Sequence, residues 1–185
     1  MNKFKNKFTN KFTNKSNLIL LWDLFTFVLL LAMDRITKYL SIHYCSDDNF
    51  TLIKNVLEIT YIENYGGALG MLNNQKFFFI FISALFICLI LFFLFVLPKQ
   101  KAFLALNIWL SFMVAGTVGN MIDRIVHGFV VDFIYVPIIK FPVFNLSDIW
   151  VTIGAIATLI ILIFKIKEKD LEFLNFKQNK YREIK

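Results

Sequence analysis

The sequence has few of the residues that break helices or form covalent and metal cross-links. Its 185 residues include 7 glycines, 3 prolines, 2 cysteines and 2 histidines. Cys45 follows the first apolar segment and Cys88 lies inside the second, so a disulfide would have to join a loop to the middle of an apolar helix. We therefore expect two free thiols. His43 and His127 are isolated and lack ligand spacing, so we predict no metal and no cofactor.

Charged residues are also scarce, and their distribution is uneven. They make up 18% of the chain, against 58% hydrophobic residues, which is too apolar for an ordinary soluble domain. The net charge of +7 does not indicate a nucleic-acid partner, because the basic residues flank the hydrophobic runs and form no basic face with interleaved aromatics. The composition indicates one membrane domain with charged tails.

Four apolar segments are each long enough to cross the ~30 Å hydrocarbon core of a bilayer as a helix. They span residues 18–42, 77–97, 102–122 and 149–166. We therefore predict an all-α membrane protein with four transmembrane helices, forming one domain over residues 17–166. A basic arm at 1–16, expected to be disordered, and a charged tail at 167–185 flank this domain.

The basic residues also predict an orientation. Four spans put both termini on one side, which carries 14 Lys and Arg against 4 on the other when Arg35 and Lys38 are left out as intrahelical. The termini are therefore predicted to be cytoplasmic and the loops 43–76 and 123–148 to lie outside. Both loops contain β-branched and aromatic residues in partial alternation, so we expect a small β element at the outer membrane surface.

Several polar residues stand near the predicted outer ends of the helices. Asp34 and Lys38 are spaced i, i+4, which is typical of a structural salt bridge, with a proton relay as the alternative. Asn64 lies in a glycine-rich loop, where a turn is the simplest meaning. Asn120 and Arg124 are again i, i+4, and such a pair suits lipid headgroups or a substrate equally well.

Two aspartates give the sharper signal. Asp132 lies in an apolar loop, where a lone carboxylate is costly. Asp148 begins the fourth predicted helix, three residues after Asn145, and by itself could be only an N-cap. Both aspartates are predicted at the same depth on the same side. Two close carboxylates share a proton, so one can activate water while the other polarises a peptide carbonyl, as in aspartic peptidases.

Five sequence blocks, in this order, resemble those of the bacterial lipoprotein signal peptidases, also called signal peptidase II. They are DRITK (34–38), ENYGGALG (63–70), GNMIDR (119–124), GFVVDFI (128–134) and FNLSD (144–148). The resemblance covers about Asp34 to Phe164. It departs from the family's usual residues at Gly67, Leu69, Ala115 and Ser147, and these changes leave the polar residues intact.

The resemblance implies a function and a set of site residues. The enzyme would be an aspartic endopeptidase of the bacterial cytoplasmic membrane, active at the outer leaflet and inhibited by the cyclic peptide globomycin. It would cleave prolipoproteins just before a diacylglyceryl-modified cysteine, with membrane lipids as its other partner, and we expect a monomer. The implied catalytic residues are Asp132 and Asp148. The residues that would line the site are Asn64, Asn120, Arg124 and Asn145, and those that would support it are Asp34 and Lys38.

Two other functions fit parts of the pattern. A four-helix transporter could use acidic residues as a proton relay, but that predicts acids near the middle of the membrane, where the only one within a hydrophobic run is Asp23. An anchoring or interaction protein could be held by the basic arm and tail. Such a protein would tolerate the loss of Asp132.

Overall fold

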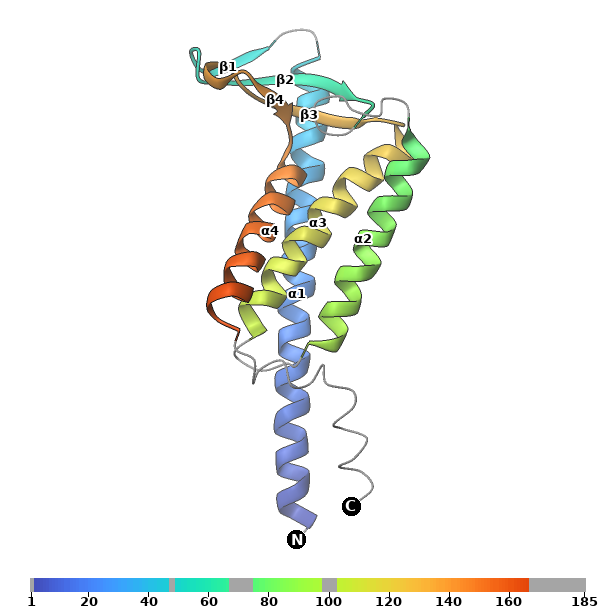
Figure 1. Ribbon diagram of the computed structural model, residues 1–185, viewed down its shortest axis with the longest axis vertical. Helices are drawn as coiled ribbons and strands as arrows, with labels where there is room; N and C mark the ends of the chain where they lie inside the picture. The colour runs from blue at the N-terminus through green and yellow to red at the C-terminus, as the bar shows by residue number, and fades with distance from the viewer. Residues whose placement is uncertain (1, 47–48, 67–74, 98–102, 167–185) are drawn as a thin grey trace.

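The computed structural model describes residues 2–46, 49–66, 75–97 and 103–166, with side chains from residue 18 onward. Figure 1 shows helices running side by side, with a small sheet lying across one end of them. The helices are α1 (Asn2–Tyr44), α2 (Lys76–Val96), α3 (Leu104–Val126) and α4 (Leu146–Phe164). The predicted small β element is therefore confirmed, on a mostly helical scaffold.

Helix α1 is longer than predicted. We expected a disordered arm through residue 16, whereas helical backbone begins at Asn2 and extends well past the ends of the other helices (Figure 1). Neither glycine nor proline occurs in residues 1–42, so no helix-breaking residue separates the basic stretch from the apolar one. The basic composition was a misleading sign of disorder, and the prediction is corrected to helix. The predicted tail at 167–185 lies outside the described residues.

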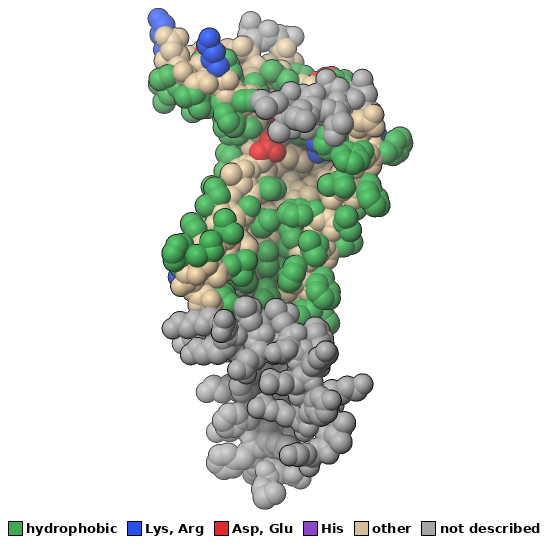
Figure 2. Space-filling model, viewed as in Figure 1, with side chains coloured by type: hydrophobic (Ala, Val, Ile, Leu, Met, Phe, Trp, Pro, Cys, Tyr) green, Lys and Arg blue, Asp and Glu red, His purple; other side chains and the backbone are tan. Residues whose placement is uncertain are grey.

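Three helices in the described part of the chain, α2, α3 and α4, are long and apolar enough to cross a membrane. They differ in how much of their surface the protein covers. In the most apolar stretch of α3, 56% of the residues are buried, against 6% in α2 and 17% in α4. α3 packs against all three other helices, so it forms the centre of the bundle. Figure 2 shows hydrophobic side chains across the helical part of the visible face.

Two glycines of α3 let the start of α4 approach closely. A Cβ at Gly116 would overlap the backbone oxygen of Ser147. A Cβ at Gly119 would overlap the Ser147 side chain and lie 2.7 Å from an oxygen of Asp34. These contacts fix the first turn of α4 against both α3 and α1.

The sheet is antiparallel throughout, in the order β1-β2-β3-β4. Its strands are β1 (Phe50–Ile53), β2 (Leu57–Asn64), β3 (Val130–Val136) and β4 (Phe141–Phe144). In the β2–β3 pairing, Ile62 lies opposite Asp132 and Asn64 lies opposite Val130. This register brings Asn64 and Asp132 to the same end of the two strands.

The ends of α3 and α4 that lead to and from the sheet also differ from the predicted ones. Helix α3 continues beyond residue 122 to Val126, so Arg124 lies within its last turn. Helix α4 begins at Leu146, and its N-cap is Asn145. The interpretation of Asp148 as the N-cap is therefore wrong. Asp148 is the third helical residue, and its side chain accepts a hydrogen bond from the N-cap backbone to complete a capping box.

Candidate active site

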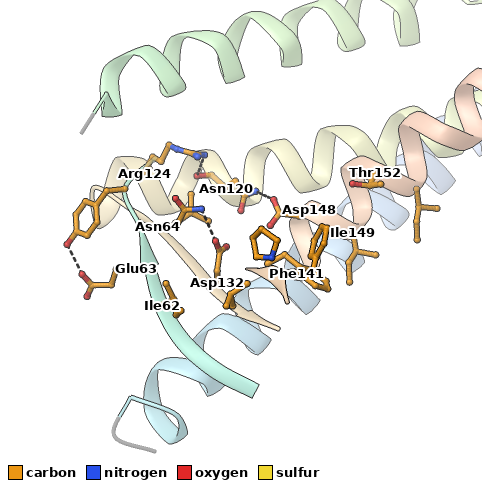
Figure 3. A pocket seen from close by; sticks show the side chains of 16 residues that line it. Ile62, Glu63, Asn64, Asn120, Arg124, Asp132, Phe141, Asp148, Ile149 and Thr152 are labelled. Carbon is orange, nitrogen blue, oxygen red and sulfur yellow. Dashed lines mark hydrogen bonds between the residues drawn. The ribbon is translucent and has the colours of Figure 1, made fainter. Parts of the chain in front are cut away.

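A cavity of about 960 Å³ lies between the sheet and helices α3 and α4 (Figure 3). Asp132 and Asp148 both line it. In the space-filling view, an acidic group is visible just below the sheet (Figure 2). The other lining residues come mainly from β2, α3, β3, β4 and α4; among them are Asn64, Asn120, Arg124, Phe141, Ile149 and Ile153. The structure thus gathers Asp132, Asp148, two amides and a guanidinium around one space, with a third carboxylate, Glu63, at its edge.

Asp132 is held by two amide groups. It extends from β3 and is 3% exposed. Asn64 Nδ2 donates to its Oδ2 at 2.9 Å, and Asn145 Nδ2 donates to its Oδ1 at 2.6 Å. Both oxygens are therefore fixed by donors from different elements, so the carboxylate has a defined orientation in the cavity wall.

The surroundings of Asp132 favour its protonated form. Burial raises the pKa of Asp132 to about 6, and the negative charge of Asp148 acts in the same direction. The hydrogen bonds from Asn64 and Asn145 oppose this rise, because they stabilise the ionised form. Asp132 can therefore lose and regain a proton near neutral pH, which is the property expected of a group in acid–base catalysis.

Asn145 connects the two aspartates. Its side-chain oxygen accepts from the backbone N–H of Asp148 at 3.1 Å, while its amide nitrogen donates to Asp132. In return, Asp148 Oδ2 accepts from the backbone N–H of Asn145 at 3.1 Å. The capping box of α4 is thus part of the site, since the residue that caps the helix also orients Asp132.

The second oxygen of Asp148 is joined to a lysine through an amide. Asn120 Nδ2 donates to Asp148 Oδ1 at 2.7 Å, and Asn120 Oδ1 accepts from Lys38 Nζ at 2.9 Å. Because Lys38 donates to the amide oxygen, the Asn120 side chain is oriented with its nitrogen toward Asp148. The predicted i, i+4 pair Asn120 and Arg124 does line the cavity, although a backbone contact, Arg124 Nη1 to Asn120 O at 3.4 Å, is what joins them.

Asn64 and Arg124 frame the cavity on the side of β2. Asn64 Oδ1 accepts from the backbone N–H of Gly66 at 3.0 Å, so the turn expected there is present in addition to the contact with Asp132. Arg124 Nη2 donates to Gly66 O at 3.1 Å, and its guanidinium lies 4.7 Å from the centre of the Phe79 ring. Arg124 therefore ties the end of α3 to the turn after β2 and to α2.

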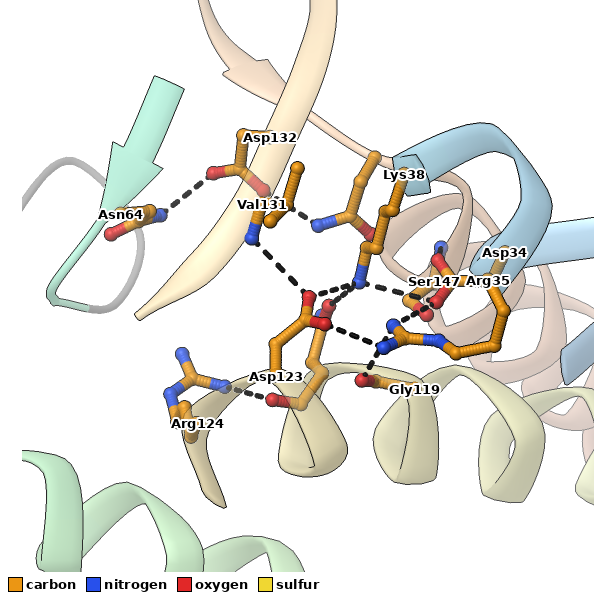
Figure 4. Close-up of polar contacts among 12 residues, drawn as sticks. Asp34, Arg35, Lys38, Asn64, Gly119, Asp123, Arg124, Val131, Asp132 and Ser147 are labelled. Atoms are coloured by element: carbon orange, nitrogen blue, oxygen red, sulfur yellow. Dashed lines mark hydrogen bonds and ion pairs between the residues drawn. The ribbon is translucent and has the colours of Figure 1, made fainter. Parts of the chain in front are cut away.

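Next to these residues lies a cluster of four charges, in which Asp34, Asp123 and Lys38 are buried and Arg35 is 30% exposed (Figure 4). Arg35 contacts Asp34 at 2.5 Å and Asp123 at 2.6 Å. Lys38 contacts Asp34 at 3.2 Å and Asp123 at 2.7 Å. The predicted Asp34–Lys38 salt bridge is present, as half of a four-membered cluster that joins α1 to α3. Matched charges make this burial tolerable, since each carboxylate has two cationic partners.

The cluster also contacts the backbone next to each site aspartate. Asp34 Oδ1 accepts from the N–H of Ser147 at 3.0 Å. Asp123 Oδ2 accepts from the N–H of Val131 at 3.2 Å. These two residues directly precede Asp148 and Asp132 in the chain. One cluster therefore positions both segments that carry the carboxylates.

Comparison with known proteins agrees with this arrangement. Residues 26–164 match the family described as signal peptidase (SPase) II. A lipoprotein signal peptidase of Clostridium tetani is 35% identical over 154 residues, covering 81% of this chain and 96% of the relative. One from Caldicellulosiruptor bescii is 40% identical over 134 residues, covering 72% and 85%. The chain belongs to the signal peptidase II family.

Solved structures support the same assignment. A bacterial membrane enzyme determined by the in meso method at 2.3 Å is 32% identical to this chain and superposes with a TM-score of 0.70, covering 79% of this chain and 92% of the other. A second such structure, at 1.9 Å, gives 32% identity and a TM-score of 0.67. The family match therefore extends to the three-dimensional fold, and the matched range contains every residue of the site described above.

Two residues of this signal peptidase II site were not identified from the sequence, namely Arg35 and Asp123. The available signal was charge balance. Lys38 and Arg35 are two cations in an apolar helix with only Asp34 beside them, which required a further acid from elsewhere in the bundle. Asp123 is the only carboxylate of α3, and it lies near the end of that helix, directly before Arg124.

Of the four residues that depart from the family's usual pattern, the structure describes Ala115 and Ser147. Ala115 is 1% exposed within α3, and Ser147 is fully buried at the start of α4. The Ser147 hydroxyl has no hydrogen-bond partner within the described structure. Gly67 and Leu69 lie outside the described residues. Across the part of the chain that the structure describes, no group of His, Cys, Asp and Glu is arranged to hold a metal ion.

Proposed function

We propose that the protein is an aspartic endopeptidase that removes the signal peptide from prolipoproteins by cleaving before the diacylglyceryl-modified cysteine. The observation that carries the proposal is that Asp132 and Asp148 line one cavity and are connected through Asn145. Family membership supports the substrate, since the relatives in Clostridium tetani and Caldicellulosiruptor bescii are lipoprotein signal peptidases.

The proposed mechanism uses one proton shared between Asp132 and Asp148. The ionised carboxylate removes a proton from a water molecule, whose oxygen attacks the scissile carbonyl, while the protonated carboxyl donates to the carbonyl oxygen. Breakdown of the tetrahedral intermediate then returns a proton to the leaving amine of the cysteine. Asn145 and Asn120 hold the carboxylate oxygens in place. Asn64 and Arg124, which line the same cavity, are proposed to bind the substrate backbone.

The proposal includes a membrane topology. We assign α1 from Leu18 to Ile42 as a fourth span beside α2, α3 and α4. The domain is then residues 17–166, with both termini and the 167–185 tail in the cytoplasm, the site at the outer leaflet of the cytoplasmic membrane, and the sheet on the outer surface. This arrangement lets the substrate's acyl chains remain in the bilayer while the scissile bond reaches the carboxylates. We propose that the enzyme acts as a monomer.

Lipid-dependent cleavage tests this function. The protein is reconstituted with two precursors of the same sequence, one carrying the diacylglyceryl group on its cysteine and one without it, and the products are analysed by mass spectrometry. We expect cleavage just before the modified cysteine and poor cleavage of the unmodified precursor. Equal cleavage of both precursors would remove lipid recognition from the proposal, and cleavage elsewhere would contradict the assigned bond.

The transporter alternative has no support. The matched family is a peptidase family, and the buried acids Asp34 and Asp123 are each paired with two cations instead of forming a chain of proton carriers. An anchoring protein remains distinguishable by experiment, because substitution of Asp132 would leave anchoring unaffected.

A further inference from the structure

Glu63 is an exposed carboxylate at the edge of the cavity, and two tyrosines fix its position. Tyr61 Oη donates to Oε1 at 2.9 Å and Tyr65 Oη donates to Oε2 at 2.6 Å. Along β2, Glu63 faces the side opposite to Ile62 and Asn64, and Glu63 and Tyr65 line the cavity at the edge of the strand. A carboxylate held in this way has little conformational freedom to lose when it binds a ligand.

The surroundings of Glu63 suit a positively charged group. The hydrogen bond from Tyr65, followed by that from Tyr61, lowers the pKa of Glu63, so the carboxylate is ionised at neutral pH. In the described part of the chain, no lysine or arginine forms an ion pair with it. The Tyr65 ring lies 5.3 Å from that of Phe129, which adds aromatic surface next to the charge. A carboxylate beside aromatic rings is a favourable site for a cation.

The cavity also has a direction. Glu63 and a tyrosine ring lie at one end of it, Asp132 and Asp148 in the middle, and Ile149 with its neighbours on α4 at the other end (Figure 3). An apolar signal peptide fits the end formed by α4. If the signal peptide occupies that end, the substrate segment that follows the scissile bond leaves past the sheet, at the end where Glu63 stands.

We propose that Glu63, held by Tyr61 and Tyr65, is a subsite for a cationic side chain in the first few residues after the cysteine of the precursor. This inference rests on the proposed function, and it adds a preference among prolipoproteins. Because Glu63 is solvent-exposed, the preference is modest and weakens as salt screens the attraction.

The test compares three diacylglyceryl-modified precursors that differ at one position shortly after the cysteine. That position carries Lys, Gln or Glu. All are assayed in vesicles of one lipid composition. We expect the wild-type enzyme to cleave the Lys precursor with a kcat/KM about 3- to 5-fold above that of the Glu precursor at low salt. Glu63→Gln should remove the difference and Glu63→Lys should reverse it. Glu58→Gln, which changes the same charge on β2 outside the cavity lining, should leave it unchanged.

The outcomes separate the subsite from the function. If the wild type cleaves all three precursors equally, or if Glu63→Gln keeps the wild-type preference, the subsite is wrong while the peptidase function stands. If Glu63→Gln changes all three rates by the same factor, Glu63 contacts something common to the precursors, such as a lipid headgroup, and the subsite is again wrong. Failure of the wild type to cleave any precursor would overturn the proposed function itself.

Discussion

Asp34 and Asp123 come from different helices, yet each accepts a hydrogen bond from the backbone N–H of the residue directly before one of the two site aspartates. Arg35 contacts both of them, at 2.5 and 2.6 Å. The distance between the segments that carry Asp132 and Asp148 is thus set by a single guanidinium together with Lys38. A mostly buried ion cluster acts here as a support for the site, and this role gives it testable consequences.

Removing the bridging cation should be strongly destabilising. Arg35→Leu leaves Asp34 and Asp123 buried with only Lys38 between them, and an uncompensated buried charge typically costs about 3–5 kcal/mol. Arg35→Lys keeps the charge but cannot contact both Asp34 and Asp123 as the guanidinium does, so we expect an intermediate loss of stability. Thermal unfolding in detergent measures both. Lys140→Gln, at an exposed turn between β3 and β4, is the matched control and should unfold like the wild type.

Asn145 offers a way to separate helix capping from orientation of Asp132. Asn145→Ser keeps a good N-cap but cannot donate to Asp132, so we expect kcat to fall by roughly 10²-fold and stability to fall by about 1–3 kcal/mol from the lost hydrogen bond. Asn145→Ala should lose the same activity and about 1 kcal/mol of stability in addition. Unfolding and single-turnover cleavage measure the two effects. Equal stability of the Ser and Ala variants would show that the cap contributes nothing.

The raised pKa of Asp132 predicts how stability changes with pH. Between its ordinary value of 3.8 and about 6, the folded protein retains a proton that the unfolded chain has lost. The free energy of unfolding therefore falls as pH rises through this window, by on the order of 3 kcal/mol in total, and is then level. Asp132→Asn should lack this decrease. Unfolding of both proteins from pH 4 to pH 7 measures it, and parallel pH profiles would show that burial does not perturb Asp132.

Gly116 and Gly119 form a matched pair for testing the close approach of α3 and α4. A Cβ at Gly116 meets the rigid backbone oxygen of Ser147, whereas one at Gly119 first meets the movable Ser147 hydroxyl. Gly116→Ala should therefore cost about 1–3 kcal/mol and not be rescued by Ser147→Ala. Gly119→Ala should be rescued in part by Ser147→Ala. Differential scanning fluorimetry in detergent distinguishes these patterns, and full rescue at Gly116 would contradict the backbone contact.

Much of the scaffold could be predicted from the sequence because apolar run length is a local property. The boundaries of α2 agreed to within one residue at each end, since Lys76 and Pro98 delimit its uncharged run. The partial alternation of β-branched and aromatic residues in the two outer loops likewise predicted the sheet. The start of α1 was missed because composition was taken as evidence of disorder where no helix-breaking residue was present.

The parts that could not be predicted depend on contacts between distant residues. The partner of Arg35, Asp123, is 88 positions away, and no periodicity encodes that pairing. The sequence offered Asp148 as a possible cap of α4, but the helix begins earlier and Asn145 is its cap. Asp148 is instead the third helical residue, and it lines the cavity.

The central claim is that Asp132 and Asp148 act as a catalytic pair, and separate substitutions test it most directly. Asp132→Asn and Asp148→Asn are reconstituted in vesicles, and cleavage of a diacylglyceryl-modified precursor is followed over time, with Glu58→Gln as a control outside the cavity lining. Each Asn variant is predicted to be folded and to lose turnover by several orders of magnitude, while the control cleaves normally. Retained turnover in both folded variants would contradict the mechanism.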